Sequence, residues 1–337
     1  MTRQALNGNA RESTGPDIRI DVYLRDGTLA TLADDVREGL AARPKTLPPK
    51  YFYDSRGSEL FEQITMLPEY YPTRAEQTIL DRVADEIVDE VQPAELVELG
   101  PGSARKTNSL LDPMAETGIG LRYVPVDVSE SAIQESAVRL ADEYESLEVH
   151  GIVGDFERHL DRVPRNGLRR LVAFLGGTIG NFDPVARQTM LRKMRAQLEP
   201  EDRLLVGTDL VKDRSQLEAA YNDSAGVTAE FNRNVLNVIN ANLEADLEPE
   251  QFEHVAVYDE QAEWVEMRLE AREAHTARIE TLAMDVAFER GEHIRTEISC
   301  KFTPDKLRGE YARAGLELIG WYTDPEGLFA LSLTGPV

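Results

Sequence analysis

The sequence is poor in cysteine and in basic residues, and each shortage excludes something. A single cysteine, Cys300, stands among 337 residues, so no intrachain disulfide can form and we expect a reducing, cytoplasmic environment. Lysine and arginine number 37 against 61 aspartates and glutamates, which gives a formal net charge of −24. Such a surface repels phosphate backbones and anionic lipids, so we expect no nucleic-acid partner, no membrane partner and a self-repelling monomer.

Long hydrophobic runs and metal-ligand patterns are also missing. No run of about 18 apolar residues occurs, so no transmembrane helix is predicted. The first 16 residues are polar and lack the apolar core of a signal peptide, and we expect residues 1–19 to form a flexible tail. The histidines show no metal-ligand spacing, so we expect no metal. They are His150, His159, His254, His275 and His293.

Short apolar runs alternate with helical segments between residues 73 and 210. The predicted strands span residues 96–99, 123–127, 149–153, 171–175 and 204–206. Strands that alternate with helices imply right-handed crossovers and a parallel sheet that is buried on both faces. Residues 73–76 (TRAE) have the form of a capping box, which predicts the start of the first helix of this block.

The pattern changes after residue 210. An amphipathic helix from Phe231 to Leu243 precedes strands of alternating polarity near residues 265–271, 284–288 and 294–302, and a helix and two strands then close the chain. We therefore predict an α/β fold with a Rossmann-like sheet and a smaller α+β lobe. The sheet domain would comprise residues 73–210 plus 300–337, and the lobe would comprise residues 20–72 plus 211–299. Ligand sites favour such lobe interfaces.

Functional side chains follow the predicted parallel strands at their carboxyl ends. Gly100 and Gly102 follow the first strand, Asp127 ends the second, and Asp155 follows the third. Doubly wound sheets bind ligands at this edge, where a carboxylate such as Asp127 can accept both ribose hydroxyls. Each feature alone also fits an ordinary turn or a solvated aspartate. Together they predict a nucleotide-type cofactor, with Phe156 near its adenine.

The glycine turn favours S-adenosylmethionine over a dinucleotide. A dinucleotide site requires G-x-G-x-x-G, but Arg105 stands where the third glycine belongs, which disfavours a nicotinamide dehydrogenase. Glu98 precedes the turn and suits a cationic cofactor better than a pyrophosphate. S-adenosylmethionine carries a sulfonium and an ammonium group and has no phosphate. The two strands after the last helix also suit a methyltransferase sheet, whose final strand typically runs antiparallel.

Several longer segments resemble the histidine Nα-methyltransferases of ergothioneine biosynthesis. They are residues 48–54 (PPKYFYD), 67–74 (LPEYYPTR), 96–100 (LVELG), 174–181 (FLGGTIGN), 207–213 (GTDLVKD), 231–236 (FNRNVL) and 297–302 (EISCKF). The resemblance extends from about residue 30 to the last strand. It implies S-adenosylmethionine-dependent transfer of three methyl groups to the α-amino nitrogen of L-histidine, which gives hercynine.

The same resemblance implies roles for individual residues. The implied cofactor-binding residues are Gly100, Lys106, Asp127, Asp155 and Phe156. The implied substrate-binding residues are Tyr70, Asn181, Tyr221, Met267, Glu297 and Ser299. Tyr53 would lie near the reacting amine. No arginine is evident for the substrate carboxylate, so the Asn181 amide and the Tyr221 hydroxyl remain as its donors.

Other interpretations stay open at this point. The tyrosines at 51, 53, 70 and 71 also fit simple packing. Arg295, Glu297, Ser299 and Lys301 alternate along one predicted strand and also fit its solvated face. A methyltransferase of the same family that acts on another amino acid or an aromatic amine is the main alternative function. A non-enzymatic cofactor-binding module is a further one.

Overall fold

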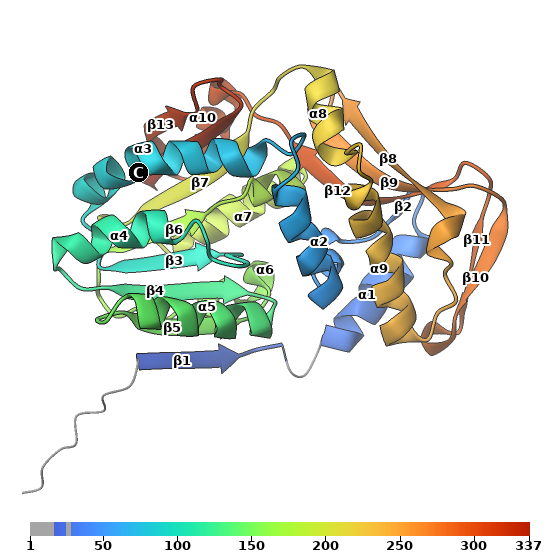
Figure 1. Ribbon diagram of the computed structural model, residues 1–337, viewed down its shortest axis with the longest axis horizontal. Coiled ribbons are helices and arrows are strands. Elements are labelled where there is room, and N and C mark those ends of the chain that lie inside the picture. Colours follow the sequence, from blue (N-terminus) through green and yellow to red (C-terminus); the bar gives the residue numbers. More distant parts are fainter. Residues whose placement is uncertain (1–16, 25–27) are drawn as a thin grey trace, which may run out of the picture.

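The computed structural model describes residues 17–24 and 28–337 and has two parts (Figure 1). An eight-stranded sheet forms one part. Its strands, in spatial order, are β1 (Asp17–Val22), β5 (Glu148–Val153), β4 (Arg122–Asp127), β3 (Glu95–Leu99), β6 (Arg170–Phe174), β7 (Arg203–Asp209), β14 (Phe329–Pro336) and β13 (Leu316–Thr323). The helices of this part are α3 (Pro72–Val91), α4 (Asn108–Thr117), α5 (Glu130–Glu143), α6 (Phe156–His159), α7 (Pro184–Ala196) and α10 (Pro304–Arg313).

The strand order confirms the predicted Rossmann-like α/β fold. The strands β1, β5, β4, β3, β6 and β7 of this sheet are parallel to one another. Strand β14 runs antiparallel to its neighbours β7 and β13. The chain reverses its direction of travel across the sheet between β3 and β6. The carboxyl ends of these two strands therefore flank the switch point at which sheets of this kind bind ligands.

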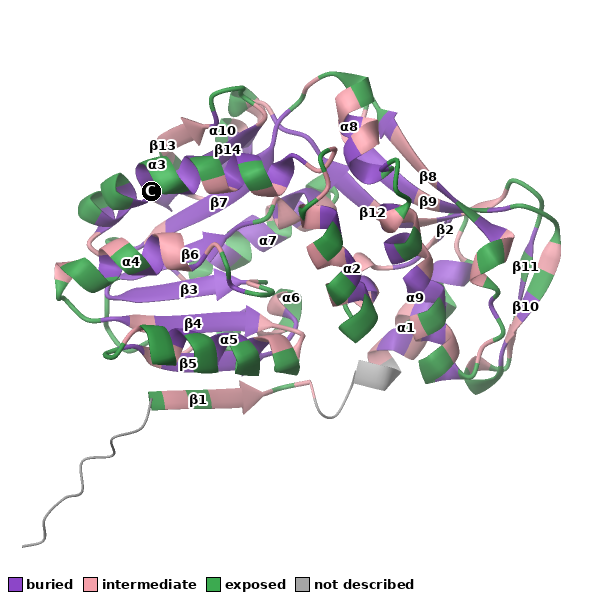
Figure 2. Ribbon diagram, in the orientation of Figure 1, coloured by how far each residue is buried: buried purple, intermediate pink, exposed green. Residues whose placement is uncertain are grey.

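Two hydrophobic cores sandwich the large sheet. Leu96 of β3 faces a core with α3, α4 and α5, whereas its neighbour Val97 faces a core with α7 and α10. Alternate residues of one strand feed opposite cores because successive side chains of a strand point to opposite faces. The central strands are consequently buried along their length (Figure 2), as their continuous apolar runs predict.

The second part is the smaller lobe, and it has its own sheet and core. Its four-stranded sheet has the order β2 (Lys45–Thr46), β12 (His293–Cys300), β9 (Trp264–Ala271) and β8 (Phe252–Asp259), and a ribbon pairs β10 (His275–Ile279) with β11 (Met284–Phe288). Its helices are α1 (Thr28–Ala41), α2 (Ser55–Thr65), α8 (Arg214–Tyr221) and α9 (Val227–Leu243). A third core joins side chains between Leu32 and Tyr71 with others between Leu217 and Ile294. The segments before and after the large sheet's central strands thus pack together.

Short 3₁₀ helices complete the secondary structure. They are η1 (Pro49–Phe52), η2 (Leu160–Arg162), η3 (Thr178–Asn181), η4 (Pro249–Gln251) and η5 (Glu280–Leu282). None of the helices within the described residues combines the length and the apolar character that a membrane crossing requires.

The end of β12 joins the smaller lobe to the large sheet. The Phe302 amide donates to the Asp209 carbonyl at 2.9 Å, and the Val211 amide donates to the Phe302 carbonyl at 3.0 Å. Ile298 and Cys300 enter the core that α7 and α10 form with the large sheet. Residues 297–301 therefore lie beside the carboxyl end of β7, at the ligand-binding edge of the sheet.

The predicted domain limits are wrong at the N-terminal end. Residues 17–22 form β1, which pairs with β5 along the edge of the large sheet and belongs neither to the tail nor to the smaller lobe. Residues 1–16 of the predicted tail lie outside the described residues. Only Ile18, Ile20 and Val22 mark this strand, because an edge strand is half exposed. We retain the rest of the two-lobe division as a proposal.

The predicted capping box is also wrong. Helix α3 begins at Pro72 with no side-chain cap. The Glu76 side chain instead turns inward, where it forms an ion pair with Lys106 and accepts a hydrogen bond from the Gly176 amide at 2.9 Å. A buried carboxylate requires a cation and donors, and the tertiary structure supplies them to Glu76 from two distant segments.

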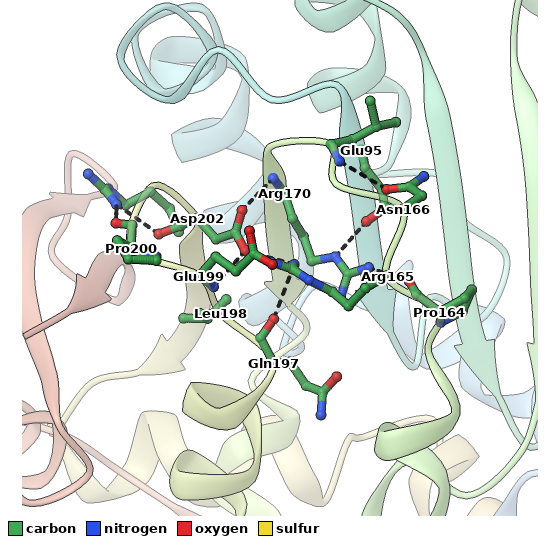
Figure 3. A network of polar contacts seen from close by, with 12 residues as sticks. Glu95, Pro164, Arg165, Asn166, Arg170, Gln197, Leu198, Glu199, Pro200 and Asp202 are labelled. Carbon is green, nitrogen blue, oxygen red and sulfur yellow. Dashed lines mark hydrogen bonds and ion pairs between the residues drawn. The ribbon is translucent and has the colours of Figure 1, made fainter.

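A polar network secures the opposite end of the large sheet (Figure 3). Arg170 and Glu95 are fully buried and form an ion pair at 2.5 Å across β6 and β3. Asp202 accepts from the Arg170 amide at 2.8 Å and pairs with Arg165 at 2.8 Å. The network lies at the amino ends of the strands, away from the ligand-binding edge, so its role is structural.

Candidate functional site

The turn after β3 leaves open space for a ligand. Gly100 and Gly102 adopt left-handed φ angles of 66° and 53°, which favour glycine. A Cβ atom added to Gly102 would meet no atom within 4 Å, and one added to Gly100 would lie 3.6 Å from the Phe156 ring. The backbone here can therefore approach a bound cofactor closely, as the sequence predicts.

Asp127 lies at the end of β4 and faces this turn. Its Oδ2 accepts from the Gly102 amide at 3.2 Å, and its Oδ1 accepts from the Ser129 amide at 2.9 Å. Burial raises the pKa of Asp127, and these amides oppose the shift. Each carboxylate oxygen has a second lone pair that can accept a ribose hydroxyl. These acceptor oxygens thus fit the ribose of a nucleoside cofactor.

Asp155 and Phe156 lie at the next strand end. The Asp155 carboxylate accepts from the Glu157 amide at 2.9 Å and caps α6, and Lys50 of the smaller lobe lies 3.7 Å away. The Phe156 ring packs edge-on against Phe174 at 5.4 Å. A cleft of about 280 Å³ opens between Asp155 and the smaller lobe. Its lining includes Tyr53, Val128, Asp155, Arg158, His159 and Val238.

Two charged residues near the turn have structural partners. Lys106, a predicted cofactor ligand, is 20% exposed and pairs with buried Glu76, so its cofactor role stays a prediction. Glu98 is buried and accepts from the Thr107 hydroxyl at 2.6 Å and the Tyr123 hydroxyl at 2.8 Å. Burial raises the pKa of Glu98, and the two hydroxyls oppose that rise. This carboxylate therefore anchors the loop, and its influence on a cationic cofactor stays a prediction.

Aromatic side chains form the wall of the smaller lobe. The Tyr53 ring lies edge-on to Phe61 at 5.6 Å and to Phe231 at 5.7 Å, and Tyr70 lies edge-on to Tyr221 at 6.4 Å. Tyr53 keeps 37% of its surface exposed at the cleft. Burial of Tyr70 and Tyr221 raises the pKa of both hydroxyls well above the usual range, so both stay protonated.

Strand β12 carries the predicted ring-binding residues. Glu297 pairs in register with Met267 of β9, which is buried. A β-bulge lies between Arg295 and Glu297, where buried Thr296 donates to Asn232 at 2.6 Å. Beyond the bulge, Ser299 and Lys301 are buried and Glu297 is partly buried. The interpretation of these residues as a solvated strand face is therefore wrong.

Glu297 is unpaired in the part of the chain that the structure describes. Within the described residues, its carboxylate makes no hydrogen bond and no ion pair, although it is partly buried. Burial raises the pKa of Glu297 to about 7, and the charge of Lys301 opposes this rise. Its charge contributes, after burial, to the raised pKa values of Tyr53, Tyr70 and Tyr221. A carboxylate left without a donor in such surroundings is typical of a ligand site.

Asn181 lies on η3, against the end of β12. A Cβ atom added to Gly180 would lie 3.0 Å from the Cys300 carbonyl oxygen and 3.5 Å from the Ser299 hydroxyl, so glycine allows this close approach. Asn181 is partly buried, and no hydrogen bond of its amide is present within the described residues. The fold thus brings η3, which carries Asn181, against Ser299, and Ser299 in turn contacts Tyr221.

A buried network beneath these residues was not predicted from the sequence. Asp209 pairs with Lys301 at 2.8 Å and with Lys212 at 2.5 Å, and it accepts from the Tyr71 hydroxyl at 2.9 Å. Burial acts to raise the pKa of Asp209, but the two lysines outweigh it and the pKa is lowered. Burial lowers the pKa of Lys212 to about 8. The sequence does carry a signal of this network, because charged residues within 207–213 and 297–302 interrupt otherwise apolar runs.

Comparison with known proteins identifies the family. The family described as "Histidine-specific methyltransferase, SAM-dependent" matches residues 32–336. The chain belongs to this methyltransferase family.

Two bacterial relatives are similar to this methyltransferase over nearly their full length. A histidine N-alpha-methyltransferase of Mycolicibacterium smegmatis is 48% identical over 91% of this chain and 96% of its own. A histidine N-alpha-methyltransferase of Mycobacterium tuberculosis is 49% identical over 90% of this chain and 94% of its own. An L-tryptophan methyltransferase of Psilocybe serbica is more distant, at 26% identity over 90% of this chain and 93% of its own.

The described residues of this methyltransferase contain no candidate metal cluster, and Cys300 is buried among them. No group of three histidine, cysteine, aspartate or glutamate side chains in the described ranges could hold a metal ion. Cys300 is buried, its thiol lies 3.6 Å from the Phe182 carbonyl oxygen, and burial raises its pKa. A thiol with a raised pKa is a poor nucleophile.

Proposed function

We propose that this methyltransferase transfers three methyl groups from S-adenosylmethionine to the α-amino nitrogen of L-histidine, giving hercynine for ergothioneine biosynthesis. The observation that carries the proposal is Glu297, a partly buried carboxylate that has no partner among the described residues and stands two positions before Ser299 on β12. Imidazole matches this pair because it offers one N–H donor and one acceptor nitrogen.

The edge of the large sheet would hold S-adenosylmethionine, whose sulfonium supplies an electrophilic methyl group. Asp127 would accept the ribose hydroxyls, and Gly100 would let the backbone approach the cofactor. Asp155 and the Phe156 ring would surround the adenine. Lys106 would also contact the cofactor, because its ion pair with Glu76 holds the lysine side chain beside the turn.

The smaller lobe and the end of β12 would hold histidine. Glu297 accepts the imidazole N–H, Ser299 contacts the other ring nitrogen, and Met267 lines the pocket beside them. The Asn181 amide and the Tyr221 hydroxyl donate to the substrate carboxylate. A site built to hydrogen-bond a polar ring rejects apolar analogues strongly, because its own polar groups would be left unpaired.

The tyrosines would position the reacting amine. Tyr53 lines the cleft that Asp155 also lines. Because its pKa is well above the usual range, Tyr53 remains a phenol that orients the amine and does not act as a phenolate base. The rings of Tyr53 and Tyr70 stabilise the methylated ammonium by about 0.5–2 kcal/mol each. Holding the amine nitrogen about 3–3.5 Å from the sulfonium methyl carbon supplies most of the rate enhancement.

Mass spectrometry of reaction products tests this function. Histidine incubated with the protein and S-adenosylmethionine is expected to gain one, two and finally three methyl groups. A panel that includes tryptophan and other amino acids separates the alternative of another substrate within the family. Faster methylation of any other amino acid would contradict the histidine assignment, and no methylated product from the panel would favour a non-enzymatic module.

We also propose that the protein is a cytoplasmic monomer. Its net charge of −24 disfavours self-association, and its single cysteine is buried, as expected for a reducing compartment. Light scattering coupled to size-exclusion chromatography checks the state. A mass near twice that of the chain would contradict the proposal.

A further inference from the structure

Strand β12 contains a β-bulge one residue before Glu297. Arg295 of β12 lies opposite Arg268 of β9. Glu297 lies opposite Met267, which is the adjacent residue of β9, so Thr296 is the extra residue of the bulge. One inserted residue turns every later side chain of a strand to the other face, because successive side chains point to alternate faces.

The bulge decides which side chains of β12 face the smaller lobe. Before the bulge, Ile294 packs in the core of this lobe. After it, Glu297 shares a face with Met267, which belongs to the same core, whereas Ile298 and Cys300 enter a core of the large sheet. An unbroken alternation from Ile294 would turn Ile298 toward the smaller lobe and Glu297 away from it. The bulge therefore turns Glu297 toward the amino-acid half of the site.

A buried asparagine of α9 holds the bulge in place. Thr296 Oγ1 donates to Asn232 Oδ1 at 2.6 Å, and both side chains are buried. Asn232 Nδ2 donates to the Arg268 carbonyl oxygen, on the opposite strand, at 3.1 Å. The amide thus bonds both strands at the bulge, and a flipped amide would place its oxygen against that carbonyl. Asn232 belongs to residues 231–236 (FNRNVL), a segment to which the proposed function gives no role.

His254 of β8 completes the network. Its Nδ1 lies 2.8 Å from Asn232 Nδ2, which can only donate, so Nδ1 is an acceptor. Its Nε2–H then donates to the Tyr221 carbonyl oxygen at 2.8 Å, at the end of α8. Burial lowers the pKa of His254, in keeping with a neutral ring. The network therefore ties the bulge to α8, α9 and β8.

We propose that Asn232 is a positioning residue for the amino-acid substrate, because through Thr296 it holds the β-bulge that turns Glu297 into the pocket. Without the Thr296 hydroxyl, β12 can relax toward an unbroken register in which the Glu297 side chain leaves the pocket. His254 fixes the direction in which the Asn232 amide points. This inference rests on the proposed function, since it explains how the fold aims a side chain that the proposed function uses.

Calorimetry of the S-adenosylhomocysteine complexes tests this role with threonine variants. Thr296→Val removes the hydroxyl at nearly constant shape and should weaken histidine binding about tenfold, with S-adenosylhomocysteine affinity changed less than about threefold. Thr296→Ser keeps the hydroxyl and should bind histidine within about threefold of the wild type. Thr334→Val is the matched control, because the buried Thr334 hydroxyl donates to the Leu204 carbonyl oxygen at 3.3 Å, at the amino end of β7. It should leave both affinities unchanged.

A double-mutant cycle separates positioning from a general loss of stability. In the Glu297→Ala background, Thr296→Val should weaken histidine binding by no more than about twofold, because the side chain that the bulge aims is gone. Equal losses in both backgrounds, or equal losses in Thr296→Val and Thr296→Ser, would overturn the inference.

The folding of the variants also decides between the two roles. If Thr296→Val does not fold, His254→Leu replaces it in the cycle, since it breaks the network from the other end. Failure of both variants to fold while Thr334→Val folds would leave the network a structural role only and overturn the inference. A wild type that neither binds nor methylates histidine would instead overturn the proposed function.

Discussion

Replacing Glu297 by glutamine should produce a defect in histidine binding whose size depends on pH. The substitution keeps the shape of the side chain and removes its charge. Because the pKa of Glu297 is raised to about 7 by burial, the wild type gains its carboxylate as the pH rises through neutrality. The fraction ionised is about one tenth at pH 6 and about nine tenths at pH 8.

The magnitude follows from these fractions. A hydrogen bond to a charged acceptor contributes about 1.5–3 kcal/mol, so the variant should bind histidine about ten- to a hundredfold more weakly at pH 8. The ratio of the two dissociation constants, variant over wild type, should be about ninefold smaller at pH 6 than at pH 8. Titration of the substrate's own imidazole and amine cancels in this ratio.

Isothermal titration of both proteins at pH 6, 7 and 8 measures the ratio, with S-adenosylhomocysteine bound throughout. Titration of S-adenosylhomocysteine alone is the control, because Glu297 lies outside the proposed cofactor half and the cofactor affinity should not change. A ratio that stays constant or falls as the pH rises would refute the reasoning. An equal loss of histidine and cofactor affinity would contradict the placement of Glu297 at the imidazole.

Three further predictions address the cofactor, the packing and the absence of a metal requirement. Asp127→Ala should weaken S-adenosylhomocysteine binding about tenfold or more, with the thermal unfolding temperature nearly unchanged. Calorimetry that shows wild-type cofactor affinity in this variant would contradict the ribose assignment. Gly207→Ala should lower the free energy of unfolding by about 1–3 kcal/mol, because the new Cβ would lie 2.1 Å from Glu76 Oε1 and 3.1 Å from the Phe329 ring. Urea denaturation measures this change, and an unchanged midpoint of unfolding would count against the prediction. Treatment with a chelator should leave methyl transfer unchanged, and activity that is lost and then restored by a divalent ion would refute a metal-free site.

Local sequence determined most of the large sheet. Strands β3 to β7 were predictable because a strand that is buried on both faces must be apolar throughout, whatever its neighbours are. Asp127 and Asp155 were predictable as edge residues for a similar reason, since every parallel strand ends at the same side of the sheet. Edge strand β1 was missed because only one of its neighbours is a strand and half of its surface stays exposed.

Tertiary structure alone decided which polar residues are buried and what they contact. The alternation in β12 was visible, but which of its faces would be covered depended on β7 and α8, which lie far away in the sequence. Glu76 and Glu98 fit a helix cap and a cofactor neighbour locally, yet each found buried partners elsewhere. Lys301 likewise found its partners Asp209, Ser299 and Tyr221 only in the folded chain. The energy of a buried charge depends on the groups that surround it, and only the folded chain brings those groups together.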